Sequence, residues 1–102
     1  MIGYVTLGTD DLTRGAAFYA AIAAELGVSR MAENARFINW GIPGCVKGIG
    51  LTLPFDGQPA TAGNGTMVAL EAKDRAQVAR LHALALSLGG TAEGAPADRV
   101  GF

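Results

Sequence analysis

The chain has 102 residues, half of them hydrophobic, and a formal net charge of −1. This length suffices for one domain with a hydrophobic core, and the near-neutral charge with scattered Lys and Arg residues argues against nucleic acid or an anionic membrane as a partner. Cys45 is the only cysteine, which excludes an internal disulfide and a cysteine-rich zinc site.

Secretion signals and membrane-spanning runs each have a recognisable sequence pattern. The first residues lack the basic segment and apolar run of a secretion signal. No apolar run is long enough to span a bilayer. We therefore expect a soluble, cytoplasmic protein without membrane contact.

The first predicted element is a strand over residues 2–7, which are apolar and β-branched. Strand alternation places Tyr4 and Thr6 on one face and Val5 and Leu7 on the other. Tyr4 and Thr6 are therefore expected to lie on the face of the sheet that points away from the helices.

A helix is predicted next, with Asp10 as its N-cap, Asp11 in its first turn and an end near Leu26. Gly27 supplies the stop. Apolar residues at three- and four-residue spacing give the helix one buried face: Leu12, Ala16, Tyr19, Ile22, Ala23 and Leu26.

A strand-rich zone follows the helix. Residues 31–40 predict one or two strands around a turn at Glu33-Asn34, and residues 46–53 predict another strand. The segment 42–44 between them has turn residues. Residues 55–65 are polar and rich in Gly and Pro, which indicates a connector.

Residues 66–72 predict a second strand, with Met67 and Ala69 on one face. Asp74 can cap a second helix, which Gly89-Gly90 ends. Its predicted buried stripe is Val78, Leu81, Ala85 and Leu88.

The two strand–helix units superimpose without a gap, Val5 on Val68 and Gly27 on Gly90, a difference of 63 in each case. This indicates an internal duplication in which Tyr4 corresponds to Met67. The second unit has no counterpart of Trp40–Leu53 before Phe102, so we expect either a longer natural chain or a truncated form with an open sheet edge.

These residues resemble a known family. Leu7-Gly8-Thr9-Asp10-Asp11-Leu12 after a strand, with Ala17-Phe18-Tyr19 on the helix, is similar to the opening of the vicinal oxygen chelate (VOC) superfamily of glyoxalases, bleomycin-resistance proteins and extradiol dioxygenases. The connector Pro54–Pro59, Gly63-Asn64-Gly65 and the Leu81-His82-Ala83 helix are similar to its small bacterial members.

The resemblance implies an α+β fold of two βαβββ modules in a single domain over residues 1–102. Residues 1–53 would form the first module, 54–65 the connector and 66–102 an incomplete second module. It also implies an open cleft between curved sheets, a homodimer, and a continuation beyond Phe102 with a further pair of strands.

The resemblance further implies where metal-dependent members hold a divalent ion. The slots would fall at Tyr4, Gly50 and Met67, with a fourth beyond Phe102. Divalent ions prefer imidazole, amide or carboxylate ligands, and none of the three slots offers one. We therefore expect no metal ion and no other cofactor.

The residue types also leave catalysis unassigned. No Ser–His–Asp or Cys–His set can be assembled, His82 fits a helix surface, and Asp10, Asp11 and Asp74 have capping explanations. Alternation instead predicts a cleft wall that suits an apolar or aromatic small molecule. Its residues are Tyr4, Thr6, Gly48, Gly50, Thr52, Met67 and Ala69, with Trp40, Phe37 and Phe55 at the rim or wall, although these aromatics could equally pack the sheets or a dimer interface.

Three functions remain open. The first is a metal-free protein that binds an unknown small molecule, as resistance proteins do. The second is a metal-dependent lyase or isomerase of the glyoxalase type with unusual or partner-chain ligands. The third is a non-catalytic structural or interaction module.

Overall fold

The computed structural model describes residues 1–45 and 47–98. Within them the chain forms six elements. In order these are β1 (Tyr4–Gly8), α1 (Leu12–Leu26), β2 (Ser29–Glu33), β3 (Phe37–Gly41), β4 (Gly48–Thr52) and α2 (Arg75–Ser87). The chain divides into two compact units, Met1–Ala69 and a second unit that begins at Leu70.

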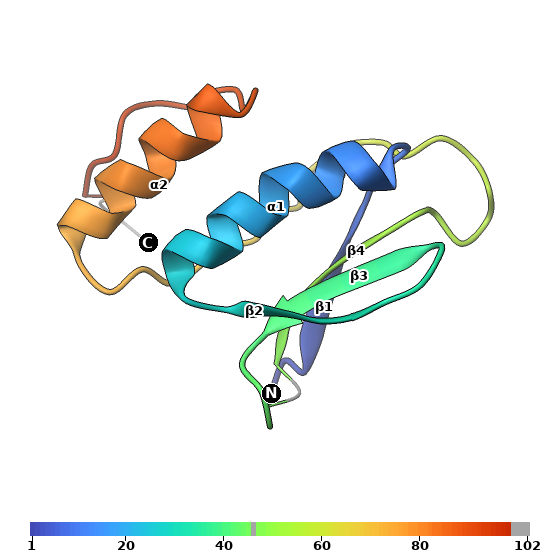
Figure 1. Cartoon of the computed structure of the whole chain (residues 1–102). Helices are drawn as coiled ribbons and strands as arrows, with labels where there is room; N and C mark the ends of the chain where they lie inside the picture. The colour runs from blue at the N-terminus through green and yellow to red at the C-terminus, as the bar shows by residue number, and fades with distance from the viewer. Residues whose placement is uncertain (46, 99–102) are drawn as a thin grey trace. The chain divides into compact units, whose positions relative to one another are not determined.

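The first unit is a complete βαβββ module, as the resemblance implied. Its sheet has the order β1-β4-β3-β2, in which β1 runs parallel to β4 and the other two pairs are antiparallel. Helix α1 lies along one face of this sheet (Figure 1). The first module was predicted to end at residue 53, one residue after β4.

The core of this module lies between α1 and the sheet. Ala16 and Ala23 of α1 pack with Ile38, Trp40 and Leu51 of the two central strands. Leu7, Leu12 and Tyr19 pack against this cluster as predicted for their faces. Burial raises the pKa of the Tyr19 hydroxyl, whose ring lies beside that of Trp40. The strands can lie close to α1 because Gly15 leaves no side chain above Leu51.

Helix α1 ends where the sequence predicted but begins one residue later. Gly27 closes it at φ +75°, in the left-handed region that favours glycine. The N-cap is Asp11, whose side chain accepts a hydrogen bond from Arg14 N, and the prediction of Asp10 is wrong. Asp10 Oδ1 instead accepts from Ala60 N at 2.6 Å and so holds the connector.

The predicted strand over residues 66–72 is not formed. Residues 66–72 have no regular secondary structure, and the described strands pair with one another and not with this segment. An extended segment becomes a strand only when a neighbour supplies its hydrogen-bond ladder, and no described strand does so here.

The second unit contains α2. Asp74 caps it as predicted by accepting from Gln77 N, and Gln77 Oε1 accepts in return from Lys73 N. The predicted buried stripe is wrong in part, because Val78 and Leu88 are exposed while Leu81 and Ala85 are partly buried. Among the described residues, no helix is long and apolar enough to cross a membrane.

Candidate functional site

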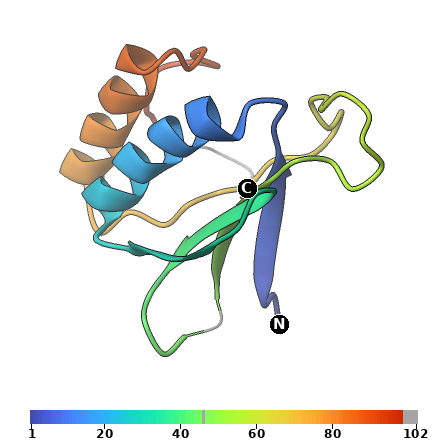
Figure 2. The same cartoon turned by 45° about the vertical axis from the view of Figure 1, so that its right-hand side comes forward.

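The candidate site is the face of the sheet that points away from α1. We call it the open face. Strand register puts the following residues on it: Tyr4, Thr6, Phe37, Asn39, Gly41, Gly48, Gly50 and Thr52. Figure 2, turned from the first view, shows α1 above the sheet and the N-terminus at the lower end of β1.

Alternation along β1 sets the first part of this face. Val5 and Leu7 are partly buried towards the helix side, whereas Tyr4 and Thr6 are exposed, Tyr4 by 65%. The pairs Tyr4–Gly48 and Thr6–Gly50 then carry the face onto β4. The predicted grouping of Tyr4, Thr6, Gly50 and Thr52 on one face is therefore what the register produces.

Three glycines lie on the open face of the two central strands, and we call them the glycine floor: Gly41, Gly48 and Gly50. A Cβ atom at Gly48 would collide with the carbonyl oxygen of Trp40, and one at Gly41 would lie 2.9 Å from the carbonyl oxygen of Lys47. Gly41 and Gly48 thus permit a close approach of β3 and β4. The backbone is therefore left without side chains across two neighbouring strands.

Gly50 has a different neighbour. A Cβ atom there would lie 2.5 Å from Cε2 of Phe37, so the phenyl ring covers the position. Phe37 faces Thr52 across the β3–β4 pair and leans diagonally over Gly50. The metal-ligand slot that the resemblance assigned to Gly50 is filled by an aromatic ring.

Met31 borders the floor on its other side. The pairing of β2 with β3 shifts between Arg30 and Ala32, so Met31 is an extra residue in a β-bulge. Its Cγ would lie 3.8 Å from a Cβ atom at Gly41, which places the side chain beside the glycine floor. Met31 was not predicted as a site residue, because a bulge leaves no clear mark in the sequence.

The prediction of Trp40 as a wall residue of the site is wrong. Trp40 is 2% exposed and packs in the core beneath α1, because it pairs with Ile49 and alternates with Asn39. The guanidinium carbon Cζ of Arg30 lies 5.7 Å from the centroid of the Trp40 ring, on the same side of the sheet. Trp40 is therefore a core residue and not a wall of the site.

The remaining predicted wall residues lie outside the sheet. Phe55 is fully exposed in the connector, and Met67, 71% exposed, lies with Ala69 in the segment that forms no strand. The described structure does not place these three residues on the paired strands with Tyr4.

Asn39 is the residue that sequence reasoning missed. It pairs with Gly50 in the centre of the open face, between Phe37 and Gly41 on β3. The alternation of Asn39 with Ile38 and Trp40 was the available signal, since a polar residue between two large apolar ones marks the outer face of a strand.

The donor set does not fit a divalent metal ion. Tyr4 offers a neutral phenol, and Gly50 offers no side chain, whereas divalent ions prefer imidazole, amide or carboxylate ligands. In residues 1–45 and 47–98, no group of three or more His, Cys, Asp or Glu side chains could hold an ion.

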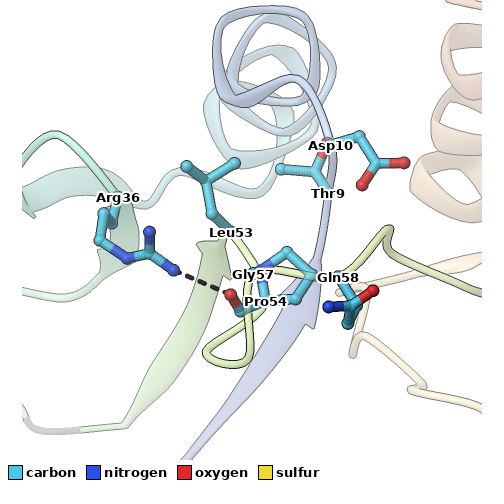
Figure 3. Close-up of a pocket in the computed structure, with 7 residues that line it drawn as sticks. All are labelled: Thr9, Asp10, Arg36, Leu53, Pro54, Gly57 and Gln58. Carbon is cyan, nitrogen blue, oxygen red and sulfur yellow. Dashed lines mark hydrogen bonds between the residues drawn. The ribbon is translucent and has the colours of Figure 1, made fainter.

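A hollow of about 200 Å³ lies at the end of β1 and β4, where the connector leaves the sheet. Figure 3 shows Arg36, Pro54 and Gln58 around it, with the guanidinium of Arg36 donating to the Pro54 carbonyl oxygen at 2.8 Å. Asp10 on its rim bonds Ala60 N. Both charged groups here hold the connector to the module, which accounts for them structurally.

A second hollow, of about 470 Å³, lies between α1 and β2. Its charged residues, Arg30 and Glu33, pair with each other at 3.4 Å on the surface. An exposed pair of this kind contributes little to stability and offers no free charge to a ligand.

Comparison with known proteins shows the family to which the chain belongs. No family model and no curated protein matches the sequence. Among solved structures, the chain is similar to the crystal structure of a glyoxalase/bleomycin resistance protein from Albidiferax ferrireducens T118. The two share 33% sequence identity with a TM-score of 0.86, over 97% of this chain and 82% of that chain. The chain has the α+β fold of that protein and belongs to the glyoxalase/bleomycin resistance protein family of the vicinal oxygen chelate superfamily.

Proposed function

We propose that this protein is a metal-free member of its family that binds a flat apolar or aromatic small molecule on the open face. The observation that carries the proposal is the ring of Phe37 above Gly50, 2.5 Å from where a Cβ atom would lie. At the position where a metal-dependent relative would need a carboxylate, this chain has an apolar surface.

The surroundings support an aromatic ligand. Gly48 is partly exposed and the Phe37 ring lies over Gly50, while Tyr4 and Met31 stand on the outer strands on either side of these central strands. Strands β1 and β2 lie three spacings apart, roughly 14 Å, which leaves room between these two side chains for a two-ring compound. Aromatic and thioether groups both pack well against aromatic rings.

Binding of naphthalene tests this proposal in the first instance. We expect the amide resonances of Gly48 and Gly50 to shift in a two-dimensional NMR titration, and we expect Tyr4→Ala to weaken binding about fivefold or more, since a ring contact contributes on the order of 1 kcal/mol. Leu86→Ala is the matched control, because it removes an exposed apolar side chain from α2 in the other unit.

Two outcomes contradict the proposal. One is an equal loss of affinity in the Tyr4→Ala and Leu86→Ala variants, which would indicate non-specific apolar binding. The other is elemental analysis of protein purified without chelator that finds about one tightly held nickel, zinc, iron or manganese ion per chain.

A further inference from the structure

Asn39 occupies the centre of the open face. Across β4 it lies in one row with Gly50 and Thr6, and along β3 its neighbours Ile38 and Trp40 point to the other side of the sheet. Both neighbours in the sequence are buried in the core, so the amide of Asn39 can point only to the open face.

The amide of Asn39 lacks a partner for its carbonyl. Its Oδ1 atom is shielded from solvent and accepts no hydrogen bond from any residue that the structure describes. A shielded polar atom without a partner costs free energy of folding, and such atoms are rare in native proteins. An unpaired acceptor in the middle of a candidate binding surface points to a partner beyond the residues that the structure describes, such as a bound molecule.

The surface around Asn39 is mostly apolar, with the exposed Thr6 in the same row. Phe37 and the glycine floor lie on either side of it, and the hydroxyl of Thr52, the next polar group on β4, already bonds the carbonyl oxygen of Arg36 at 3.2 Å. The side chain as a whole is partly exposed, and because the χ2 torsion of an Asn is broad, pairing with a ligand requires a rotation that turns Oδ1 towards the face when the ligand binds. A ligand held flat on this face would meet the amide of Asn39 in a mostly apolar setting.

We infer that Asn39 is the specificity-determining residue of the open face, and that the molecule bound there is an aromatic compound carrying a hydrogen-bond donor such as a phenolic hydroxyl. This inference rests on the proposed function and adds the chemical class of the ligand to it. The donor of the ligand pairs with Oδ1 of Asn39 while its rings lie on the glycine floor between Tyr4 and Met31.

Two probes of similar size test the inference. 2-Naphthol carries a hydroxyl donor, and 2-methoxynaphthalene carries the same oxygen without a donor. We expect the unmodified protein to bind 2-naphthol about tenfold more tightly, the effect of one hydrogen bond in an apolar site. In Asn39→Leu, which keeps the shape and removes the acceptor, we expect this ratio to fall to about one.

Asn39→Asp is the conservative variant, because it keeps the acceptor and loses the amide donor. We expect it to retain the preference for 2-naphthol. A preference lost in both variants would show that the amide acts as a donor and would overturn the inference.

Unfolding in urea without ligand gives an independent measurement. Because Oδ1 has no partner within the described chain, Asn39→Leu should unfold at the same or a higher urea concentration than the unmodified protein. A clearly lower midpoint would show that Asn39 pairs inside the protein, which overturns the inference.

Failure of the inference and failure of the proposed function are distinguishable. If naphthalene binds and responds to Tyr4→Ala but 2-naphthol shows no advantage, the inference is wrong and the proposed function stands. If none of the three compounds shifts the Gly48 and Gly50 resonances, the proposed function and the inference both fail.

Discussion

Gly50 and Phe37 form the pair of residues that most distinguishes this site from a metal centre. Phe37 can lean over β4 only because Gly50 has no side chain. The two positions are therefore linked, and a side chain restored at position 50 must first displace the ring. A carboxylate introduced there alone would not be free to bind an ion.

A double-mutant cycle measures this linkage. We expect Gly50→Ala to lower the free energy of unfolding by about 1–3 kcal/mol, as overpacking does. In a Phe37→Ala background the same change should cost nothing, because the ring that the new methyl group would meet is gone. Urea unfolding followed by circular dichroism gives all four values.

Gly3→Ala is the control for the cycle, since a Cβ atom at Gly3 would meet no other atom within 4 Å. It should leave the stability unchanged within about 0.5 kcal/mol. Additive effects of Gly50→Ala and Phe37→Ala would mean that the ring does not lie over Gly50.

At the scale of elements, α1 shows how two adjacent acidic residues divide two tasks. Asp11 caps the helix by accepting from Arg14 N at 3.0 Å, and Asp10 accepts from Ala60 N in the connector. Either residue could cap a helix by chemistry alone. Backbone direction decides, because Asp11 has the extended conformation of an N-cap, φ −132° and ψ 95°.

Removing this cap should therefore weaken α1. We expect Asp11→Ala to lower the free energy of unfolding by about 1 kcal/mol, because Arg14 N loses its acceptor. Asp11→Asn keeps an acceptor at the same position and should retain most of the stability. Thermal unfolding of the three proteins compares them, and a stability of Asp11→Ala equal to that of the unmodified protein would contradict the assignment.

Helix α2 of the second unit is formed and capped although part of its apolar face is exposed. Helix α2 has its reciprocal cap at Asp74 and Gln77 and ends before Gly89, which has φ +100°. Val78, Leu86 and Leu88 nevertheless remain exposed. Capping and helix propensity can form a helix, whereas burial of its stripe requires a neighbouring surface.

At the scale of the whole molecule, large apolar side chains are exposed in both units. Among the described residues they are Met1, Ile2, Tyr4, Met31, Ile42, Phe55, Met67, Leu70, Val78, Leu86 and Leu88. Strands β1 and β2 also form the two edges of the sheet. Exposed apolar surface and free strand edges both favour association with another chain.

We therefore expect a homodimer in solution at micromolar concentration. Light scattering coupled to size-exclusion chromatography measures the mass directly, against 10.4 kDa for one chain. Because the association would bury apolar surface, raising the salt concentration to about 1 M should not dissociate it, whereas charge-driven association would be screened. A monomer under these conditions contradicts the expectation.

Local patterns in the sequence were enough for much of the first module. Alternation over β1 predicted that Tyr4 and Thr6 share a face, and Gly27 predicted the end of α1, because both depend on residues close in the chain. The order of strand, helix and strands, with the resemblance, also predicted the α+β fold that comparison with a solved structure shows.

Pairing between distant residues decided the rest. Trp40 and Phe37 are both large aromatics of one strand, and only the register with β4 and the position of α1 put Trp40 in the core and Phe37 over Gly50. Residues 66–72 have the composition of a strand but no ladder to join, since hydrogen bonding to a neighbour is not encoded in the segment itself. The bulge at Met31 and the unpaired Oδ1 of Asn39 likewise arise from how strands meet, which no stretch of sequence contains alone.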